Sequence, residues 1–308
     1  MITNLPEPSE FKSLSVQYLV QAIDHILKTE LAIAPLSLLD DSFELEEEWE
    51  NRQGILGNSL IMLFLSIENY FKYKVCLKCP TELLTEESSS HLSTPDSIDF
   101  EELYIVGLEE LTSKYQKIEG NVLSGSALDT LEQLRIRRNK FTHGLHRELI
   151  EPKDIVHAIS VFLTEIWGNK WVSDLKEVML TEPLYGMLRD EEEDMQLLQY
   201  YKFFEKYLSN RKFRKLIGMP ERGRRYLCPH CQDSSIESGS LLNADYACLE
   251  PNTPESTEVH CWLCQEYAEV ERISCNDEKC PANVIYPTDS FKLHINNCCL
   301  TCCGEQGN

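Results

Sequence analysis

The fold of this chain follows from one apolar stretch, Leu60-Ile61-Met62-Leu63-Phe64-Leu65-Ser66-Ile67. It lies at the centre of residues 54–78, whose pattern favours a long helix that ends before Pro80. Because this centre is apolar on every side, it is typical of a helix that other helices surround. The stretch is too short to cross a bilayer. The sequence therefore predicts a helical bundle built around residues 54–78.

Helical patterns flank this central segment on both sides. Apolar residues recur at helical spacing over residues 11–28, and the acidic residues 44–53 are compatible with a helix. Further helices are expected over 100–118, 126–144, 152–167, 171–180, 195–210 and 212–217. Residues 81–99 are rich in Ser, Thr and acids and are expected to form a loop, and the acidic run 190–194 a solvated helix start or loop. Little strand pattern precedes residue 225, so the fold class is mainly α.

Cysteine usage divides the chain. Of its thirteen cysteines, only Cys76 and Cys79 precede Cys228, and the others lie between Cys228 and Cys303. We expect a helical domain over residues 1–168, a helical extension with a basic linker over 169–225, and a small Cys-rich module over 226–308. Such a small module needs metal ions to hold it together.

The Cys-rich module has the spacing of zinc ligands. Two Cys-X2-Cys knuckles, Cys228/Cys231 and Cys261/Cys264, complete one four-thiolate site and predict a zinc ribbon, with strand-like entries at residues 225–227 and 258–260. A second site would use Cys275, Cys280, Cys299 and Cys302. Two other ways of grouping the ligands stay open. His294 and Cys298 could replace Cys299 and Cys302, or Cys261 and Cys264 could share a site with Cys275 and Cys280. Both Zn²⁺ ions are expected to be structural, with no catalytic metal, because protein ligands fill every position.

Three further cysteines are expected to be packed thiols rather than ligands. Cys248 is interpreted as a small core residue, and Cys76 and Cys79 lie one turn apart near a helix end. The N-terminus has neither the basic nor the apolar region of a secretory signal, and cysteines at this density outside an oxidising compartment favour metal binding. We therefore expect a cytoplasmic protein with no membrane association.

The chain carries a formal net charge of -22, which disfavours general adhesion to nucleic acid or anionic membranes. Any contact with nucleic acid must therefore be local. One cluster of cations precedes the first knuckle and is a candidate RNA-binding surface: Lys212, Arg214, Lys215, Arg222, Arg224 and Arg225. The alternative is a linker whose charges balance acidic neighbours such as Glu221 and the run 190–194.

The clearest helix, residues 126–144, carries the most informative motif, Arg138-Asn139-Lys140-Phe141-Thr142-His143. Ser126 and Asp129 resemble a capping box, and Gly144 is a C-terminal stop. Apolar residues form one stripe along this helix, and Arg138 occupies a position where a leucine is expected: Leu128, Leu131, Leu134, Arg138, Phe141 and Leu145. A guanidinium in such a position needs a carboxylate, a phosphate or an interface cleft.

His143 lies on another side of the same helix. It is five positions from Arg138, which is about 140° around an ideal helix. Asn139 shares a face with His143 and could orient the imidazole. Arg138 and His143 would meet at one phosphate only if the last turn distorts near Gly144 or if a second copy of the helix contributes the missing residue. The alternative is a surface helix whose C-terminal histidine favours the helix dipole.

These residues resemble a known family. Residues 133–144 resemble the third helix of the HEPN ribonuclease superfamily, whose signature is Arg-X4-6-His, and Glu68-Asn69-Tyr70-Phe71-Lys72 is similar to its second helix. The resemblance covers roughly residues 11–167. It implies a HEPN-like helical bundle that dimerises into a metal-independent endoribonuclease, with Arg138 and His143 catalytic and Asn139 as the polar residue after the arginine. Glu68 is expected either to support Arg138 by pairing with it or to pair with Lys72.

The expected function is therefore RNA cleavage, in which the 2′-hydroxyl attacks the adjacent phosphorus and leaves a 2′,3′-cyclic phosphate. The family's settings suggest a prokaryotic defence effector, either anti-phage, abortive-infection or toxin. The expected partners are RNA, a second copy across the Arg138/His143 helix, and a regulatory partner or antitoxin. The alternative is a non-catalytic helical and zinc-ribbon scaffold that binds a protein or nucleic acid. A zinc-dependent hydrolase is disfavoured, because no His-X3-His or paired-carboxylate motif accompanies the cysteines.

Overall fold

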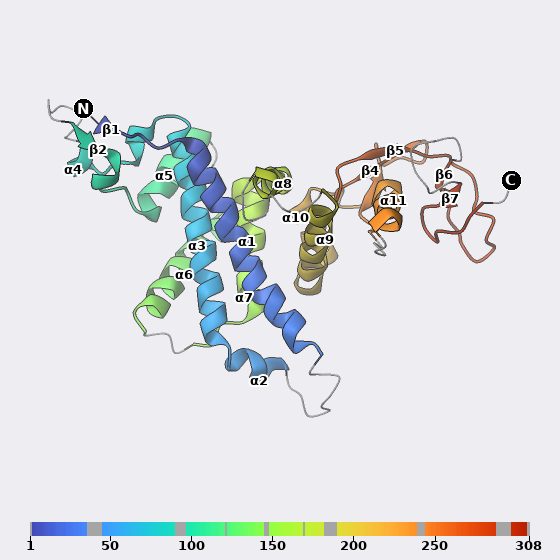
Figure 1. The fold of residues 1–308 in the computed structure, drawn as a ribbon, viewed down its shortest axis with the longest axis horizontal. Coiled ribbons are helices and arrows are strands. Elements are labelled where there is room, and N and C mark those ends of the chain that lie inside the picture. Colours follow the sequence, from blue (N-terminus) through green and yellow to red (C-terminus); the bar gives the residue numbers. More distant parts are fainter. Residues whose placement is uncertain are drawn as a thin grey trace. The chain divides into compact units, whose positions relative to one another are not determined.

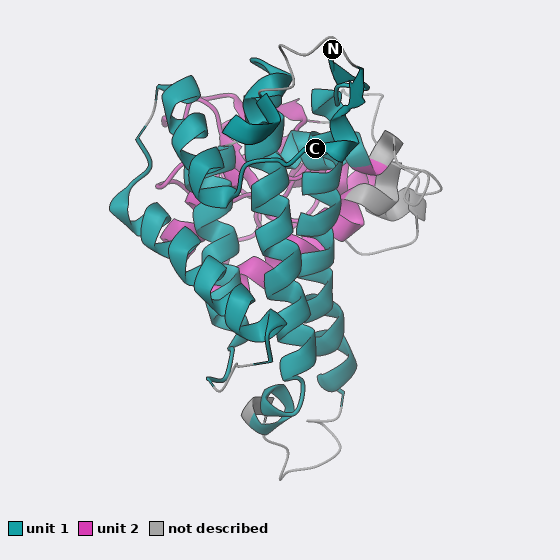
Figure 2. Cartoon of the chain, turned by 90° about the vertical axis from the view of Figure 1, so that its left-hand side faces the viewer, with its two compact units in different colours: residues 1–178 teal, residues 179–308 magenta. Residues whose placement is uncertain are grey.

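The structure is a computed structural model that describes residues 2–35, 45–89, 97–120, 122–144, 148–168, 170–181, 190–238, 244–287 and 297–306. The chain forms two units, residues 1–178 and 179–308 (Figure 2). Among the described residues the first unit is mainly helical, and the second combines helices with short strands (Figure 1).

The first unit contains most of the helices. They are α1 (Pro8–Ile33), α2 (Leu45–Glu50), α3 (Gln53–Cys76), α4 (Glu86–Ser89), α5 (Leu108–Glu119), α6 (Gly125–Thr142), α7 (Pro152–Val161) and α8 (Trp171–Thr181). Helix α7 continues as a π-helical turn, Phe162–Trp167, and short 3₁₀ turns lie at Pro80–Leu83 and Phe100–Glu102. Strand β1 (Ile2–Thr3) pairs in parallel with β2 (Ile98–Asp99).

Helices α1 and α3 lie side by side and run antiparallel (Figure 1). Buried serines join the two helices. Ser15 and Ser66 each donate a hydroxyl hydrogen bond to the other's carbonyl oxygen, both at 2.8 Å. Further along the pair, Ser59 donates to the carbonyl oxygen of Ala22 at 2.6 Å. Small side chains let two helix backbones approach closely, and these bonds satisfy the buried hydroxyls. The serines therefore set the register of the central pair.

Helix α3 is the central core helix of the first unit. By length and composition alone it is long and apolar enough to cross a membrane, unlike the shorter stretch at its centre. In the structure, 61% of its most apolar window is buried. Leu60, Leu63 and Ile67 are almost fully covered. This burial is what a helix surrounded by other helices requires, as its apolar sequence predicted.

A glycine brings α6 close to α3. A Cβ built on Gly57 would lie 2.0 Å from two ring carbons of Phe141, whereas one built on Gly54, in the first turn of α3, meets nothing within 4 Å. Gly57→Ala should therefore displace the Phe141 ring and destabilise the unit by about 1–3 kcal/mol. Gly54→Ala should stabilise it by about 0.5–1 kcal/mol, because alanine restricts the unfolded chain. Urea midpoints of the two variants should shift in opposite directions; equal shifts would contradict this close packing.

Two sequence-based expectations in the first unit were wrong in detail. The helix expected over 100–118 begins only at Leu108, because Phe100–Glu102 forms a 3₁₀ turn and the following residues are not helical. The cap of α6 is Ser124 rather than Ser126, since the Ser124 hydroxyl accepts a hydrogen bond from the amide of Ala127 at 3.0 Å. Residues 81–89 include short helical turns, and 90–96 lie outside the described residues.

The second unit is built from α9 (Asp190–Tyr207), α10 (Asn210–Ile217), α11 (Pro229–Ser238) and two small sheets. Strands β3 (Ala247–Leu249), β4 (Glu258–Cys261) and β5 (Tyr267–Glu269) form an antiparallel sheet, and β6 (Ile285–Tyr286) pairs with β7 (Cys298–Cys299). The acidic run 190–194 begins α9, one of the two forms expected for it. Helix α11 occupies part of the insertion after the first knuckle, where the sequence suggested none.

Aromatic packing joins α9 and α10 to the Cys-rich sheet. Tyr201 of α9 packs its ring against Phe213 of α10 and Tyr246 beside β3, with centroids 5.8 and 5.1 Å apart. Its hydroxyl donates to the carbonyl oxygen of Trp262 at 2.8 Å, and burial raises the Tyr201 pKa well above its ordinary value. Residues 179–225 therefore belong to the same unit as the cysteines, although the sequence suggested an extension and linker.

Candidate functional site

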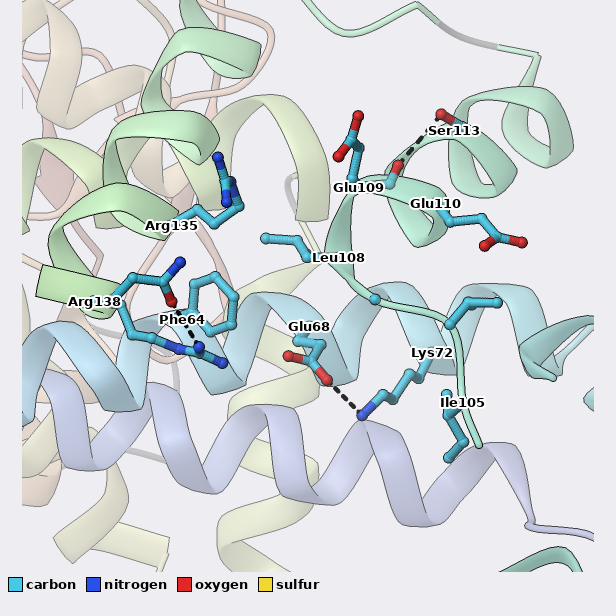
Figure 3. A pocket seen from close by; sticks show the side chains of 13 residues that line it. Phe64, Glu68, Lys72, Ile105, Leu108, Glu109, Glu110, Ser113, Arg135 and Arg138 are labelled. Atoms are coloured by element: carbon cyan, nitrogen blue, oxygen red, sulfur yellow. Dashed lines mark hydrogen bonds and ion pairs between the residues drawn. The ribbon is translucent and has the colours of Figure 1, made fainter. Parts of the chain in front are cut away.

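The second half of α6 carries the Arg138 motif along the face that meets α3. Leu131 and Leu134 on this face are buried, with 6% and 5% of their surface exposed. One turn further on, the half-buried Arg138 places its guanidinium carbon 4.4 Å from the centroid of the Phe64 ring (Figure 3). Arg138 therefore points toward α3, as its position in the apolar stripe predicted. Leu145, at the end of that stripe, lies outside the described residues.

Arg138 has a neutral polar partner. Its Nη1 donates a hydrogen bond to Oδ1 of Asn139 at 2.8 Å. Among the described residues no carboxylate forms an ion pair with it. A half-buried guanidinium keeps a strong preference for an anion, and its fork matches the oxygens of a phosphate. Arg138 is thus a candidate anion-binding group.

Arg138 opens onto a pocket of about 810 Å³ between α3, α6 and the segment that begins α5 (Figure 3). The pocket is lined by Phe64, Glu68, Lys72, Ile105, Val106, Gly107, Leu108, Glu109, Glu110, Ser113, Arg135, Arg138 and Asn139. The other two cations of this lining already have carboxylate partners. Arg135 binds Glu132 through two nitrogens, both at 2.8 Å, and Lys72 binds Glu68 at 2.7 Å. Among the described residues, Arg138 is therefore the cation of this lining that has no carboxylate partner.

Glu68 does not support Arg138. It lies one turn from Lys72 on α3, and the two form an ion pair in the pocket wall. The expectation that Glu68 holds the Arg138 fork is corrected, and the alternative pairing with Lys72 is what the structure has. The reason is geometric: residues four apart on one helix reach each other without any tertiary requirement.

His143 lies outside this pocket. It follows the last residue of α6, its side chain is exposed, and it is not among the residues that line the pocket. Its backbone amide donates to the carbonyl oxygen of Asn139 at 3.0 Å, so the last turn is a regular helix and no distortion brings His143 to Arg138. The Asn139 side chain engages Arg138, which corrects the expectation that it orients the imidazole.

Two groups of four cysteines lie in the second unit. In each group the sulfur atoms lie within 4.8 Å of one another, and each group can hold a metal ion. The first contains Cys228, Cys231, Cys261 and Cys264, and the second contains Cys275, Cys280, Cys299 and Cys302. This is the partition that the knuckle spacing favoured. His294 of the alternative partition lies outside the described residues.

The sulfur positions fit a tetrahedral metal. In the first group Cys228 and Cys264 are 3.6 Å apart and Cys231 and Cys261 are 3.9 Å apart. In the second, both measured pairs are 3.8 Å apart. A tetrahedron with metal–sulfur bonds of about 2.3 Å has edges of about 3.8 Å, far longer than the disulfide bond of about 2.05 Å. Hydrogen bonding with the neighbouring sulfurs, together with burial, raises the pKa of Cys231, a proton-holding tendency that a bound cation would oppose.

The three cysteines expected to be packed thiols, Cys76, Cys79 and Cys248, are at least partly buried. Cys248 is fully buried in β3, and burial raises the pKa of its thiol. Burial also raises the pKa of Cys76 to about 11, and its sulfur lies 3.4 Å from the carbonyl oxygen of Pro6. The Cys79 sulfur lies 3.1 Å from the hydroxyl of Thr81. None of the three belongs to a metal-ligand group among the described residues.

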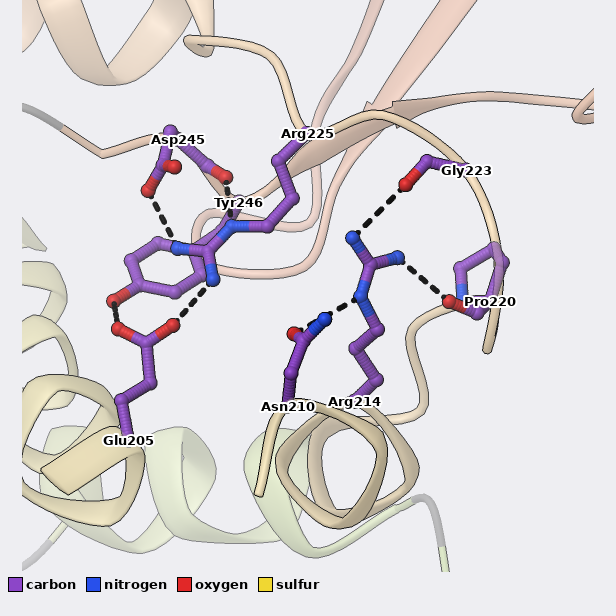
Figure 4. A network of polar contacts seen from close by, with 8 residues as sticks. All are labelled: Glu205, Asn210, Arg214, Pro220, Gly223, Arg225, Asp245 and Tyr246. Atoms are coloured by element: carbon purple, nitrogen blue, oxygen red, sulfur yellow. Dashed lines mark hydrogen bonds and ion pairs between the residues drawn. The ribbon is translucent and has the colours of Figure 1, made fainter. Parts of the chain in front are cut away.

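Two of the six cations expected to bind RNA are structural. Arg214 is buried, with 4% exposed, and donates to the carbonyl oxygens of Pro220 and Gly223 (Figure 4). Arg225 binds the carboxylates of Glu205 and Asp245 and stacks 4.6 Å over the Tyr246 ring. Their roles as RNA ligands are corrected, because all three nitrogens of each guanidinium group already donate hydrogen bonds within the protein. The remaining four, Lys212, Lys215, Arg222 and Arg224, are exposed.

Sequence reasoning missed the far wall of the pocket. Phe64 was predicted as core, but nothing in the sequence indicated that its ring lies under Arg138. Residues 105–110 were expected to be helical throughout, yet the first of them are extended and bring Glu109 and Glu110 to the pocket. Comparisons with protein-family models, with curated proteins and with solved structures found no match for this chain.

Proposed function

We propose that this chain is an endoribonuclease of the HEPN type. The observation that carries the proposal is the half-buried Arg138 guanidinium, which stacks on Phe64 and opens onto a pocket. Its side-chain hydrogen-bond partner is the neutral Asn139, and no described carboxylate forms an ion pair with it. The resemblance of residues 133–144 to the Arg-X4-6-His helix supplies the reaction class. An RNA phosphate provides the anion that Arg138 lacks.

The chemistry uses the nucleophile that RNA itself contains. The 2′-hydroxyl attacks the adjacent phosphorus, the 5′-oxygen departs, and a 2′,3′-cyclic phosphate and a 5′-hydroxyl end remain. Arg138 stabilises the charge that develops on the phosphoryl oxygens. His143 takes the 2′-hydroxyl proton or gives one to the leaving oxygen. Asn139 holds the guanidinium through its side-chain oxygen. This route needs no catalytic metal.

The site is completed by a second copy of the chain. Within one chain Arg138 lines the pocket, and His143 lies outside it after the end of α6. A homodimer related by a two-fold axis across α6 would place the imidazole of one protomer at the Arg138 of the other. The proposed active site is therefore composite, and two such sites form per dimer.

The cysteine groups are proposed to hold structural Zn²⁺. Four thiolates in a tetrahedral arrangement are the preferred donor set of zinc, and neither group leaves a position for substrate. The ions would stabilise the fold of the second unit by linking its segments. We place the protein in the cytoplasm as a defence effector, either anti-phage, abortive-infection or toxin, that a regulatory partner or antitoxin restrains.

A second candidate function is a non-catalytic scaffold that binds a protein or nucleic-acid partner. The separation of His143 from the Arg138 pocket favours it, because a single chain then offers an anion site without the imidazole. Under this candidate the pocket binds an anionic group but breaks no bond.

RNA-end analysis separates these candidates. Purified protein incubated with unstructured RNA should produce ends with 2′,3′-cyclic phosphate and 5′-hydroxyl groups, identified by ligation-based sequencing. Cleavage should persist after brief EDTA treatment that leaves the second unit folded, because RNA supplies its own nucleophile. Intact RNA under every condition, with tight binding of a partner, would instead support the scaffold. Hydrolytic ends with a 3′-hydroxyl would contradict the proposed chemistry.

A further inference from the structure

We use the name basic surface for four exposed cations that lie close together in the sequence of the second unit: Lys212, Lys215, Arg222 and Arg224. The two lysines lie on α10, and the two arginines lie in the segment that follows it. None of the four has an ion-pair partner among the described residues, whereas the neighbouring Arg211 is paired with Glu221 at 3.2 Å. The basic surface is therefore a local excess of positive charge in a chain whose net charge is -22.

The segment that carries Arg222 and Arg224 is held in one shape by buried contacts. From α10, the buried Arg214 donates to the carbonyl oxygens of Pro220 at 2.8 Å and Gly223 at 3.0 Å (Figure 4). These bonds fold the segment back onto the helix that carries the two lysines. Arg214 thus uses its guanidinium group to bond backbone carbonyl oxygens inside the unit. The exposed arginines remain available to a ligand.

Contacts from the sheet side hold the same segment. Asn252 donates through Nδ2 to the carbonyl oxygen of Arg222 at 2.8 Å. Gly223 has φ +125°, and a Cβ there would lie 2.6 Å from Asn252 Nδ2, so glycine is required. The backbone of the segment is thus held from both sides, so little backbone ordering is needed when a ligand binds.

The composition of the basic surface fits a polyanion rather than a protein partner. Protein interfaces are enriched in aromatic and other apolar residues at their centre. In the described part of the second unit, the exposed large apolar side chains are Tyr267 and Ile273, which lie on or near β5 rather than on α10 or the following segment. The aromatic residue beside the surface, Tyr226, is buried and offers no face for stacking a base. Contacts would therefore go to phosphates alone.

We propose that the basic surface binds the phosphate backbone of single-stranded RNA without base preference. The choice of RNA as the polyanion rests on the proposed function. The charge and exposure of the basic surface do not depend on whether the site at Arg138 cleaves RNA. Arg222 and Arg224 would take the phosphate oxygens with their forks, and Lys212 and Lys215 would act as point charges.

The test measures RNA binding in full-length, metal-loaded protein. A His143→Ala background keeps the RNA intact, and fluorescence anisotropy with a labelled 20-nucleotide oligouridine follows binding. Adding Arg222→Ala and Arg224→Ala should weaken binding at least tenfold at low salt. The slope of log affinity against log salt should fall by about 1.4, since each single-strand phosphate contact contributes about 0.7. A second probe, oligoadenosine, should give the same losses.

The matched control is Lys28→Ala with Lys279→Ala, which makes the same change in net charge at two exposed lysines that do not belong to the basic surface. It should leave affinity within about twofold, because exposed charges that contact no phosphate are largely screened by salt. Equal weakening by both pairs would overturn the proposal, because net charge and not this surface would then govern binding. Unchanged RNA binding in Arg222→Ala/Arg224→Ala protein, with loss of an acidic protein partner, would overturn it as well.

This experiment separates the two proposals. If the wild type cuts no RNA but the Arg222→Ala/Arg224→Ala pair weakens binding as expected, the proposed function fails and the basic surface stands. If Arg138→Ala abolishes cleavage but the arginine pair leaves affinity and salt slope unchanged, the basic surface fails and the proposed function stands. Metal content and far-ultraviolet circular dichroism confirm that each variant is folded.

Discussion

A mixture of Arg138→Ala and His143→Ala proteins should cut RNA although neither variant does so alone. Each single substitution should lower the cleavage rate by about 10³-fold, the usual loss when a charge-stabilising group or a general acid–base is removed. After subunit exchange, half of the dimers are mixed, and each mixed dimer holds one intact site of two. Activity should therefore recover to about a quarter of the wild type.

The physical reason is the separation of the two residues along α6. Arg138 lies over Phe64 and lines the pocket, while His143 follows the regular last turn and is exposed. A mixed dimer pairs the intact Arg138 of one protomer with the intact His143 of the other. The second site combines both substitutions and stays inactive. Single-turnover cleavage of a labelled RNA, before and after mixing, measures the recovery.

Arg137→Ala is the matched control for charge. Arg137 is the neighbour of Arg138 on α6 but binds Asp154 of α7 at 3.0 Å and does not line the pocket. This substitution should change cleavage by less than about threefold, because it removes a partly exposed ion pair worth up to about 1 kcal/mol. A mixture that stays inactive, with mixed dimers shown by native mass spectrometry, would contradict the composite site. Full activity of Arg138→Ala alone would contradict the proposed function as a whole.

Replacing one ligand of the first cysteine group should unfold most of the second unit. Wild-type protein should bind two metal ions per chain, and Cys231→Ser should retain one. Structural zinc contributes roughly 10–16 kcal/mol of apparent binding free energy in small domains at neutral pH. The first group connects α11 to β4 and to the turn that follows β4. Trp262 lies in that turn, between the ligands of the second knuckle, and its carbonyl oxygen accepts a hydrogen bond from Tyr201 of α9. Losing this ion should therefore weaken the packing of α9 and α10 against the sheet as well.

The second group should behave differently. Its ligands Cys275 and Cys280 pack against a small cluster formed by Ala282, Ile285 and a third ligand, Cys299. Cys275→Ser should therefore also lose one ion, but the aromatic packing of α9 and α10 should keep its protection from hydrogen exchange. Native mass spectrometry counts the ions, and hydrogen exchange over residues 197–217 reports the packing.

Cys248→Ser serves as the control for both ligand variants, since Cys248 is buried but belongs to neither group. It should keep two ions and lose only modest stability, because the Arg214 guanidinium that bonds to this thiol can also bond to a hydroxyl. Two ions retained in Cys231→Ser, or one lost in Cys248→Ser, would contradict the assignment of ligands. Equal loss of protection in Cys231→Ser and Cys275→Ser would contradict the different roles of the two groups.

Local patterns were enough to predict most of the elements. The all-apolar centre of α3 predicted a buried helix because periodicity reports which sides of a helix avoid water. The Cys-X2-Cys knuckles predicted the first metal-ligand group because two ligands on one tight turn already have half of the required geometry. The position of Arg138 in an apolar stripe predicted that it faces another helix. All three inferences depend on residues that are close in sequence.

What only the tertiary structure decided depends on residues distant in sequence. The sequence showed that Arg138 needs an anion or a cleft, but the ring of Phe64 and the wall at residues 105–110 come from other elements. Composition placed six cations in one cluster and could not show that Arg214 and Arg225 satisfy carbonyl and carboxylate groups inside the unit. The sequence shows which residues carry a charge. Which group pairs with that charge depends on tertiary packing. For this protein, the sequence alone therefore determined the helices, the cysteine ligands and the motif, and the tertiary structure decided which cations remain for a ligand.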